Sequence, residues 1–180
     1  AEPLFVTDYI SCGHVDPEVI ASIVKGIAQA CQKAGCALLG GETAEHPGLL
    51  APDEFDVAGA TTGVVERDEI LGPERIAEGD ALIAVASSGL HSNGYSLVRH
   101  VLLEQAGWTL DRHVDELGRT VGEELLEPTI VYAADLLALA HHSEVHAMCH
   151  VTGGGLANNL TRVMPSHLTA TIERSTWSPA

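Results

Sequence analysis

The run of residues 17–34 constrains the fold most, because its apolar side chains recur at helical spacing. Asp16 and Pro17 are residue types preferred at the cap and the first position of a helix, and Gly35 is typical of a helix end. The apolar positions share one broad face and are Val19, Ile20, Ile23, Val24, Ile27, Ala28 and Cys31. The sequence therefore predicts a long amphipathic helix near the start of the chain.

Strand-like and helical segments alternate along the chain. Strands are expected at 4–10, 36–39, 56–65, 81–87, 145–151 and 168–172. Further helices are expected at 94–105, from Pro128 onward and near 156–164, with a polar connection at 111–122. The alternation predicts an α/β or mixed α+β fold, and the turn residues from Gly72-Pro73 to Glu78-Gly79-Asp80 place a domain boundary in that stretch.

Charge and composition exclude several classes of partner. The 180 residues include 9 basic and 25 acidic side chains, a net charge of −16, which repels nucleic acid and anionic lipid. The apolar run at 81–86 is far shorter than the roughly 20 residues that a membrane-spanning helix needs, and the first residues do not resemble a signal peptide. The four scattered cysteines favour a reducing cytoplasm, with Cys31 and Cys36 as core residues rather than metal ligands.

The stretch from Ala86 to Leu97 is the most informative candidate site. An apolar strand is expected to lead into small residues at the start of a helix, an arrangement that binds anions. The possible donors are Ser87, Ser88, Ser92 and Asn93, and Gly89 and Gly94 would allow a phosphate to approach the backbone. An ordinary capped turn explains the pattern equally well. His91 is a candidate proton shuttle or donor, although a lone loop histidine is more often an exposed bystander.

Two carboxylates and a hydroxyl follow the strand expected at 36–39. Glu42, Thr43 and Glu45 lie in a Gly-rich stretch, and Asp56 heads a later strand. Carboxylate oxygens suit Mg²⁺, which also binds substrate phosphates, so the group is a candidate Mg²⁺ site. The glutamates are equally well explained as acids at the start of a helix.

The third candidate stretch contains two histidines followed by glycines. His146 and His150 lack the acid of a zincin helix, and on a strand they would stand over 13 Å apart by the roughly 3.3 Å rise per residue. A shared zinc ion is therefore not expected. Thr152, Gly153 and Gly154 instead open a second Gly-rich loop before a helix, which favours another phosphate or ribose contact. Walker loops, nucleophile elbows and dinucleotide fingerprints are missing from the sequence.

Taken together, these stretches resemble the phosphoribosylformylglycinamidine cyclo-ligase (aminoimidazole ribonucleotide synthetase) family. The matching stretches, in order, are 1–5, 40–45, 56–59, 88–99, 126–129, 150–155 and 172–173. The resemblance implies a two-domain ATP-dependent fold, with 1–70 as the later part of a first, dimer-forming domain and 71–180 as the start of a second α/β domain. It also implies a cytoplasmic homodimer that uses ATP and Mg²⁺.

The reaction that the resemblance implies is closure of formylglycinamidine ribonucleotide to aminoimidazole ribonucleotide, in purine biosynthesis. His91 would be catalytic, and the substrate or its phosphate would be held by Ser88, Gly89, Ser92, Asn93, Gly94, Thr152, Gly153 and Gly154. Glu42, Thr43 and Asp56 would lie on the nucleotide side, with Glu42 a metal ligand.

One departure from the family pattern concerns length. Family members are nearly twice as long, and their nucleotide loop and several metal-binding aspartates precede the segment that matches Ala1–Phe5. We therefore expect this chain to be a fragment. The alternatives are a sister kinase or synthetase of the same superfamily, or a catalytically incomplete dimerisation piece.

Overall fold

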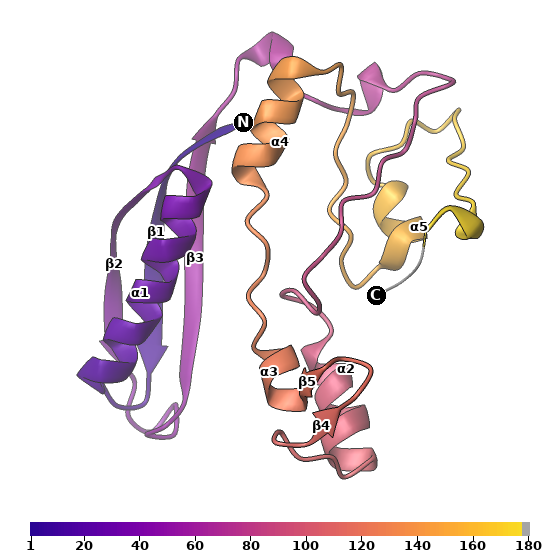
Figure 1. Cartoon of the computed structure of the whole chain (residues 1–180). Coiled ribbons are helices and arrows are strands. Elements are labelled where there is room, and N and C mark those ends of the chain that lie inside the picture. The colour runs from indigo at the N-terminus through magenta and orange to yellow at the C-terminus, as the bar shows by residue number, and fades with distance from the viewer. Residues whose placement is uncertain (178–180) are drawn as a thin grey trace. The chain divides into compact units, whose positions relative to one another are not determined.

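The computed structural model describes residues 1–177, which form two compact units (Figure 1). Unit 1 consists of Ala1–Ile70 and Val131–Glu144, and unit 2 consists of Leu71–Ile130 and the chain from Val145 onward. Helices and strands both occur, so the mixed α/β class predicted from the sequence is confirmed. Among the described residues, none of the helices combines the length and the apolar character needed to span a membrane.

A three-stranded sheet forms the centre of unit 1. The central strand β1 (Glu2–Cys12) pairs in parallel with β2 (Ala37–Glu45) and antiparallel with β3 (Phe55–Val64). Helix α1 (Pro17–Ala34) connects β1 to β2 and packs on both strands (Figure 1). Helix α4 (Ala133–His142) contacts α1 and β1, so a segment distant in sequence completes this unit.

The predicted helix at 17–34 is confirmed together with its two end signals. The Asp16 carboxylate accepts hydrogen bonds from the backbone N–H groups of Glu18 and Val19, at 2.9 and 3.4 Å. Gly35 ends the helix with φ of 74°, a conformation that favours glycine. Cys31 is buried, as predicted, and burial raises the pKa of its thiol. Ile10 and Cys12 of β1 are buried as well and complete the core of this unit.

The stretch 40–45 is strand and not loop, contrary to the prediction. Its backbone continues β2 and pairs with residues 7–12 of β1, which satisfies the backbone polar groups that a loop would leave to solvent. The pairing register shifts between Val6 and Thr7, where Leu39 is an extra residue on β2. Gly40 has φ of 150° at this irregularity, so the Gly-Gly pair allows β2 to continue past it.

Unit 2 is built from short elements. Helix α2 (Tyr95–Val98) continues as a π-helical segment, η3 (Arg99–Gln105), so the helix predicted at 94–105 is confirmed in position. A small hairpin of β4 (His113–Val114) and β5 (Arg119–Thr120) leads into α3 (Val121–Leu125). Helix α5 (Gly155–Leu160) follows the second Gly-rich loop. The 3₁₀ turns are η1 (Arg67–Glu69) in unit 1 and η2 (Pro73–Arg75) and η4 (Arg174–Thr176) in unit 2.

Several predicted elements of the second half are wrong. Within residues 1–177 the segments 81–87, 145–151 and 168–172 form no strand, because an apolar pattern does not by itself supply a neighbour for a hydrogen-bonded ladder. Ile83, for example, is 83% exposed. The polar connection predicted at 111–122 contains the β4–β5 hairpin and the start of α3. The helix predicted to open at Pro128 begins at Ala133, since the Pro128 carbonyl accepts a hydrogen bond from a loop side chain instead.

Replacing the fully buried side chain of β1 tests this description of the core. Ile10→Ala should lower the free energy of unfolding by about 2–5 kcal/mol, because it removes buried methyl groups and leaves a cavity. Urea denaturation followed by circular dichroism measures the change. Ile70→Ala is the matched control, since Ile70 is 54% exposed and its truncation should cost less than about 0.5 kcal/mol. Equal losses for the two variants would contradict a core centred on β1.

Candidate functional site

His91 folds back onto the start of its own loop in unit 2, here called the 88–94 loop. Its Nε2 accepts a hydrogen bond from the backbone N–H of Ser88 at 3.0 Å and lies 3.0 Å from the Ser88 hydroxyl oxygen. An N–H group can only donate, so Nε2 is the unprotonated nitrogen and the neutral imidazole carries its proton on Nδ1. The loop thus fixes both the orientation of this half-buried ring and its tautomer.

The 88–94 loop is attached to a second part of unit 2, residues 119–128, here called the 119–128 segment. The Ser88 hydroxyl donates a hydrogen bond of 2.8 Å to the Pro128 carbonyl. The Tyr95 hydroxyl, just after the loop, lies 2.9 Å from the Leu90 carbonyl and 3.0 Å from the Leu125 carbonyl, so its single hydrogen is shared between them. Two hydroxyl groups therefore link the two stretches.

A carboxylate from the same segment lies against the loop backbone at Gly89. A Cβ atom at this position would stand only 2.9 Å from Glu124 Oε1, and Gly89 has φ of 140°. Both observations explain why residue 89 is glycine. The contact brings a negative charge close to the backbone of the loop.

Arg119 holds that carboxylate. Its Nε lies 3.3 Å from Glu124 Oε2, and its Nη1 lies 2.5 Å from Glu127 Oε2. The hydrogen bond with Glu127 is the main reason that the pKa of Arg119 is raised. The neighbouring Thr120 and Glu123 form a capping box that starts α3, and the backbone N–H of Thr120 is the main cause of the lowered pKa of Glu123.

The remaining residues of the loop present polar groups to solvent. Ser92 and Asn93 are exposed, and the Asn93 side-chain amide donates to the Ser92 hydroxyl at 3.2 Å. Gly94, with φ of 95°, precedes α2 without a side-chain cap. The structure therefore brings Ser88, Gly89, His91, Ser92, Asn93 and Gly94 together in one loop, as their positions in the sequence require.

The second Gly-rich loop is held by an asparagine that the sequence reasoning missed. Asn159 is 1% exposed, and its amide nitrogen donates to the carbonyls of Gly155 at 2.7 Å and Thr152 at 3.4 Å. The Thr152 hydroxyl donates to the Asn159 side-chain oxygen at 3.0 Å. Gly154 lies against the same amide, since a Cβ there would be 3.0 Å from its nitrogen. The sequence signal that could have identified Asn159 is a polar residue at a core-facing position of a short helix.

His146 pairs with an aspartate. Its Nδ1 lies 2.6 Å from Asp80 Oδ2, and its backbone carbonyl accepts from the N–H of Gly72. The hydrogen bond between the His146 and Asp80 side chains is the main reason that the pKa of Asp80 is lowered. Among residues 1–177, histidines, cysteines and carboxylates nowhere gather in threes as a metal centre would need.

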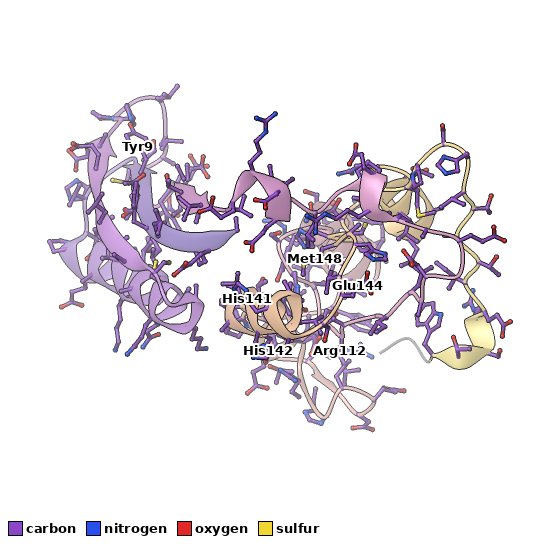
Figure 2. All side chains as sticks on the ribbon, turned by 90° about the horizontal axis from the view of Figure 1, so that it is seen from above. Tyr9, Arg112, His141, His142, Glu144 and Met148 are labelled. Carbon is purple, nitrogen blue, oxygen red and sulfur yellow. The ribbon has the colours of Figure 1, made fainter. Side chains whose placement is uncertain are left out.

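The acidic candidates of unit 1 lie on the sheet. Glu42 pairs with Tyr9 across β2 and β1, and Asp56 pairs with Ser11 across β3 and β1. Cross-strand neighbours share a face, so both carboxylates lie on the face of Tyr9, which is the side of the sheet away from α1 (Figure 2). Strand β1 separates them. Thr43, paired with the buried Ile10, is half-buried and belongs to the opposite face.

Glu45, at the end of β2, has a local structural task. Its Oε1 accepts from the backbone N–H of Val15 at 2.6 Å and lies 2.8 Å from His14 Nδ1. The backbone N–H of Val15 is the main cause of its lowered pKa. Nearby, the Tyr9 hydroxyl and His46 Nε2 are 3.1 Å apart. The contacts of Glu45 with His14 and Val15 fix the turn that leads from β1 into α1.

Comparison with known proteins identifies relatives of both halves of the chain. Residues 1–65 match the family model described as AIR synthase related protein, N-terminal domain, and residues 77–180 match the corresponding C-terminal domain. Curated proteins named phosphoribosylformylglycinamidine cyclo-ligase, from Bacillus thuringiensis (strain Al Hakam) and Bacillus cereus (strain AH820), are each 51% identical to it over 177 residues. The alignments cover 98% of this chain and 51% of each relative, so the chain spans about half the length of the curated relatives it matches.

The Asp80–His146 pair predicts a specific dependence of stability on pH. A carboxylate whose pKa is lowered by folding stabilises the fold above its unfolded pKa, and this contribution is lost as the pH falls through the folded pKa. Wild type should therefore be more stable than Asp80→Asn near neutral pH, and the difference should vanish well below about pH 4. Urea unfolding across this range measures it.

The control for this experiment is Asp53→Asn, which alters an exposed aspartate of unit 1. It should produce a much smaller difference at every pH. A difference between wild type and Asp80→Asn that persists unchanged in strong acid would show that the carboxylate charge is not what stabilises the pair.

Proposed function

Because the chain belongs to the AIR synthase related family, we propose that its protein converts formylglycinamidine ribonucleotide and ATP into aminoimidazole ribonucleotide, ADP and phosphate. This is a ligase reaction of purine biosynthesis. The observation that carries the proposal is 51% identity to named cyclo-ligases over almost the whole chain, which includes the 88–94 loop. The full activity is proposed for a protein of the length of those relatives.

The chemistry needs the amide oxygen of the formyl group to become a good leaving group. This oxygen attacks the γ-phosphorus of ATP, and the bond to the bridging oxygen breaks to release ADP. The product is an iminophosphate. The neighbouring amidine nitrogen then attacks the activated carbon, the carbon–oxygen bond breaks and inorganic phosphate leaves. The protein contributes mainly by positioning the groups and by stabilising charge.

The 88–94 loop supplies groups suited to the phosphate end of this reaction. Ser92 and Asn93 are exposed donors, and the backbone N–H of Ser88 holds the His91 ring in a fixed orientation beside them. We assign His91 the catalytic role, and Ser88, Gly89, Ser92, Asn93 and Gly94 the binding of substrate and phosphate. Thr152, Gly153 and Gly154 are assigned a second contact. Its supporting observation is the ordering of their loop by Asn159.

The nucleotide side is assigned to Glu42, Thr43 and Asp56. Mg²⁺ usually takes one or two protein carboxylates and completes its coordination with water and phosphate oxygens. The exposed carboxylate of Glu42 fits one such ligand position, and Asp56 lies on the same face of the sheet. The described residues hold no preformed cluster of three ligands, so most of the coordination would come from elsewhere. Bound Mg²⁺ would neutralise charge on the nucleotide phosphates.

We also propose that the protein is a cytoplasmic homodimer with a domain boundary after residue 70. Strand β3 is exposed along its whole length, and the outer edges of β2 and β3 pair with no other strand among residues 1–177. An exposed sheet of this kind is suited to pairing with a second copy. The four cysteines are all free thiols, which accords with a reducing compartment.

Product analysis tests the proposed reaction. The full-length protein should form ADP and aminoimidazole ribonucleotide in equal amounts from formylglycinamidine ribonucleotide, ATP and Mg²⁺. ADP without the imidazole product would indicate a sister kinase of the superfamily. If neither product formed and the protein still dimerised, only the role of a dimerisation module would remain.

Replacing His91 separates a catalytic role from a structural one. His91→Ala should lower kcat roughly 100- to 10,000-fold, as expected for loss of a catalytic proton donor. The melting temperature should change little, because the half-buried ring contributes little to a core. Steady-state kinetics and calorimetry measure the two effects.

The matched control is His167→Ala, an exposed histidine of the same unit, which should leave both quantities nearly unchanged. A large drop in melting temperature for His91→Ala, with kcat falling only in proportion to the folded fraction, would assign His91 a structural role instead.

A further inference from the structure

The 88–94 loop lies against a carboxylate whose negative charge should oppose the proposed binding of a phosphorylated substrate. Glu124 lies against the Gly89 backbone, and its side chain is only 21% exposed, so water screens its charge poorly. The proposed substrate and the transferred group both carry phosphate. An unpaired carboxylate at this position would repel these anions, since like charges close together in a partly buried site interact unfavourably.

The position of Arg119 removes this electrostatic repulsion. The guanidinium group forms an ion pair with Glu124, with Nε 3.3 Å from Oε2, and donates a hydrogen bond from Nη1 to Glu127, so one cation is held between two carboxylates. Its position is itself fixed, because Arg119 begins β5, pairs with Val114 of β4 and is followed by Thr120, which caps α3. Arginine is suited to this arrangement because its planar fork can donate in two directions at once.

We propose that Arg119 is a positioning residue for the 88–94 loop: it orients Glu124 against Gly89 and neutralises its charge, so that the loop accepts a phosphorylated substrate. The inference rests on the proposed function for the identity of that substrate. In this positioning role Arg119 touches neither the substrate nor the reacting atoms. It acts through Glu124, and its loss should therefore affect substrate binding more than the chemical step.

The test is a pair of variants in the full-length enzyme. Arg119→Ala should raise KM for formylglycinamidine ribonucleotide about tenfold and change kcat less than about threefold, because it leaves a carboxylate unpaired beside the loop. The double variant Arg119→Ala/Glu124→Gln should recover most of that loss, since it removes the unpaired charge and keeps the shape of the side chain. A purely structural role for Arg119 would not be rescued by this second change.

Two further variants keep the test decisive. Arg119→Lys retains the charge but not the planar fork of the guanidinium group, so it should raise KM by less than the tenfold expected for Arg119→Ala. It is the test variant if Arg119→Ala does not fold. Arg162→Ala removes an exposed arginine of the same unit and should leave KM unchanged. An unchanged KM in Arg119→Ala, or a double variant no better than the single one, would overturn the proposal.

Hydrogen exchange separates this proposal from the proposed function. The backbone amides of residues 88–94 should exchange several-fold faster in Arg119→Ala than in the parent, whether or not the enzyme turns over. An enzyme that makes no aminoimidazole ribonucleotide but shows this acceleration would refute the function and keep the positioning role of Arg119. Normal turnover with unaltered exchange and unaltered KM would refute the positioning role alone.

Discussion

The attachment of the 88–94 loop to the 119–128 segment is the interaction on which the candidate site depends. The loop follows a stretch without a strand, so neighbouring secondary structure supports it only on the side of α2 and η3. Its shape comes from the Ser88–Pro128 and Tyr95–Leu125 hydrogen bonds and from the carboxylate placed at Gly89. Within the loop, the backbone of Ser88 then orients His91 and determines its tautomer. The His91 ring is thus oriented by Ser88, and the loop that carries both is held by polar contacts from distant sequence.

Unit 1 is stabilised on a different principle. Its central strand is paired on both sides, and a capped amphipathic helix covers one face, so burial of Ile10, Cys12 and Cys31 holds the layers together. The other face carries Tyr9, Glu42 and Asp56 and is available for the nucleotide side of the proposed reaction. One unit is therefore organised by apolar packing, and the site loop of the other by hydrogen bonds and one cation between two carboxylates.

Features that depend on neighbouring residues could be predicted from the sequence, whereas features that depend on contacts between distant segments could not. Helix α1 was predictable to the residue, because Asp16, Pro17 and Gly35 act on their immediate neighbours. The candidate loop was also recognisable, since its polar and glycine residues are contiguous. Strand β2 was predicted too short, because pairing with β1 overrides the glycines at 40 and 41. The roles of Glu124, Arg119 and Asn159 depend on contacts between separate segments, so no local sequence pattern indicates them.

We propose that the full-length protein activates an amide oxygen by phosphorylating it. The most direct test uses formylglycinamidine ribonucleotide whose formyl oxygen carries a heavy isotope, with the full-length enzyme and unlabelled ATP. Mass spectrometry of the released phosphate then reports where that oxygen went. Phosphorylation of the formyl oxygen predicts one labelled oxygen in each phosphate formed with aminoimidazole ribonucleotide. Ring closure with the label appearing in water, and unlabelled phosphate, would contradict it.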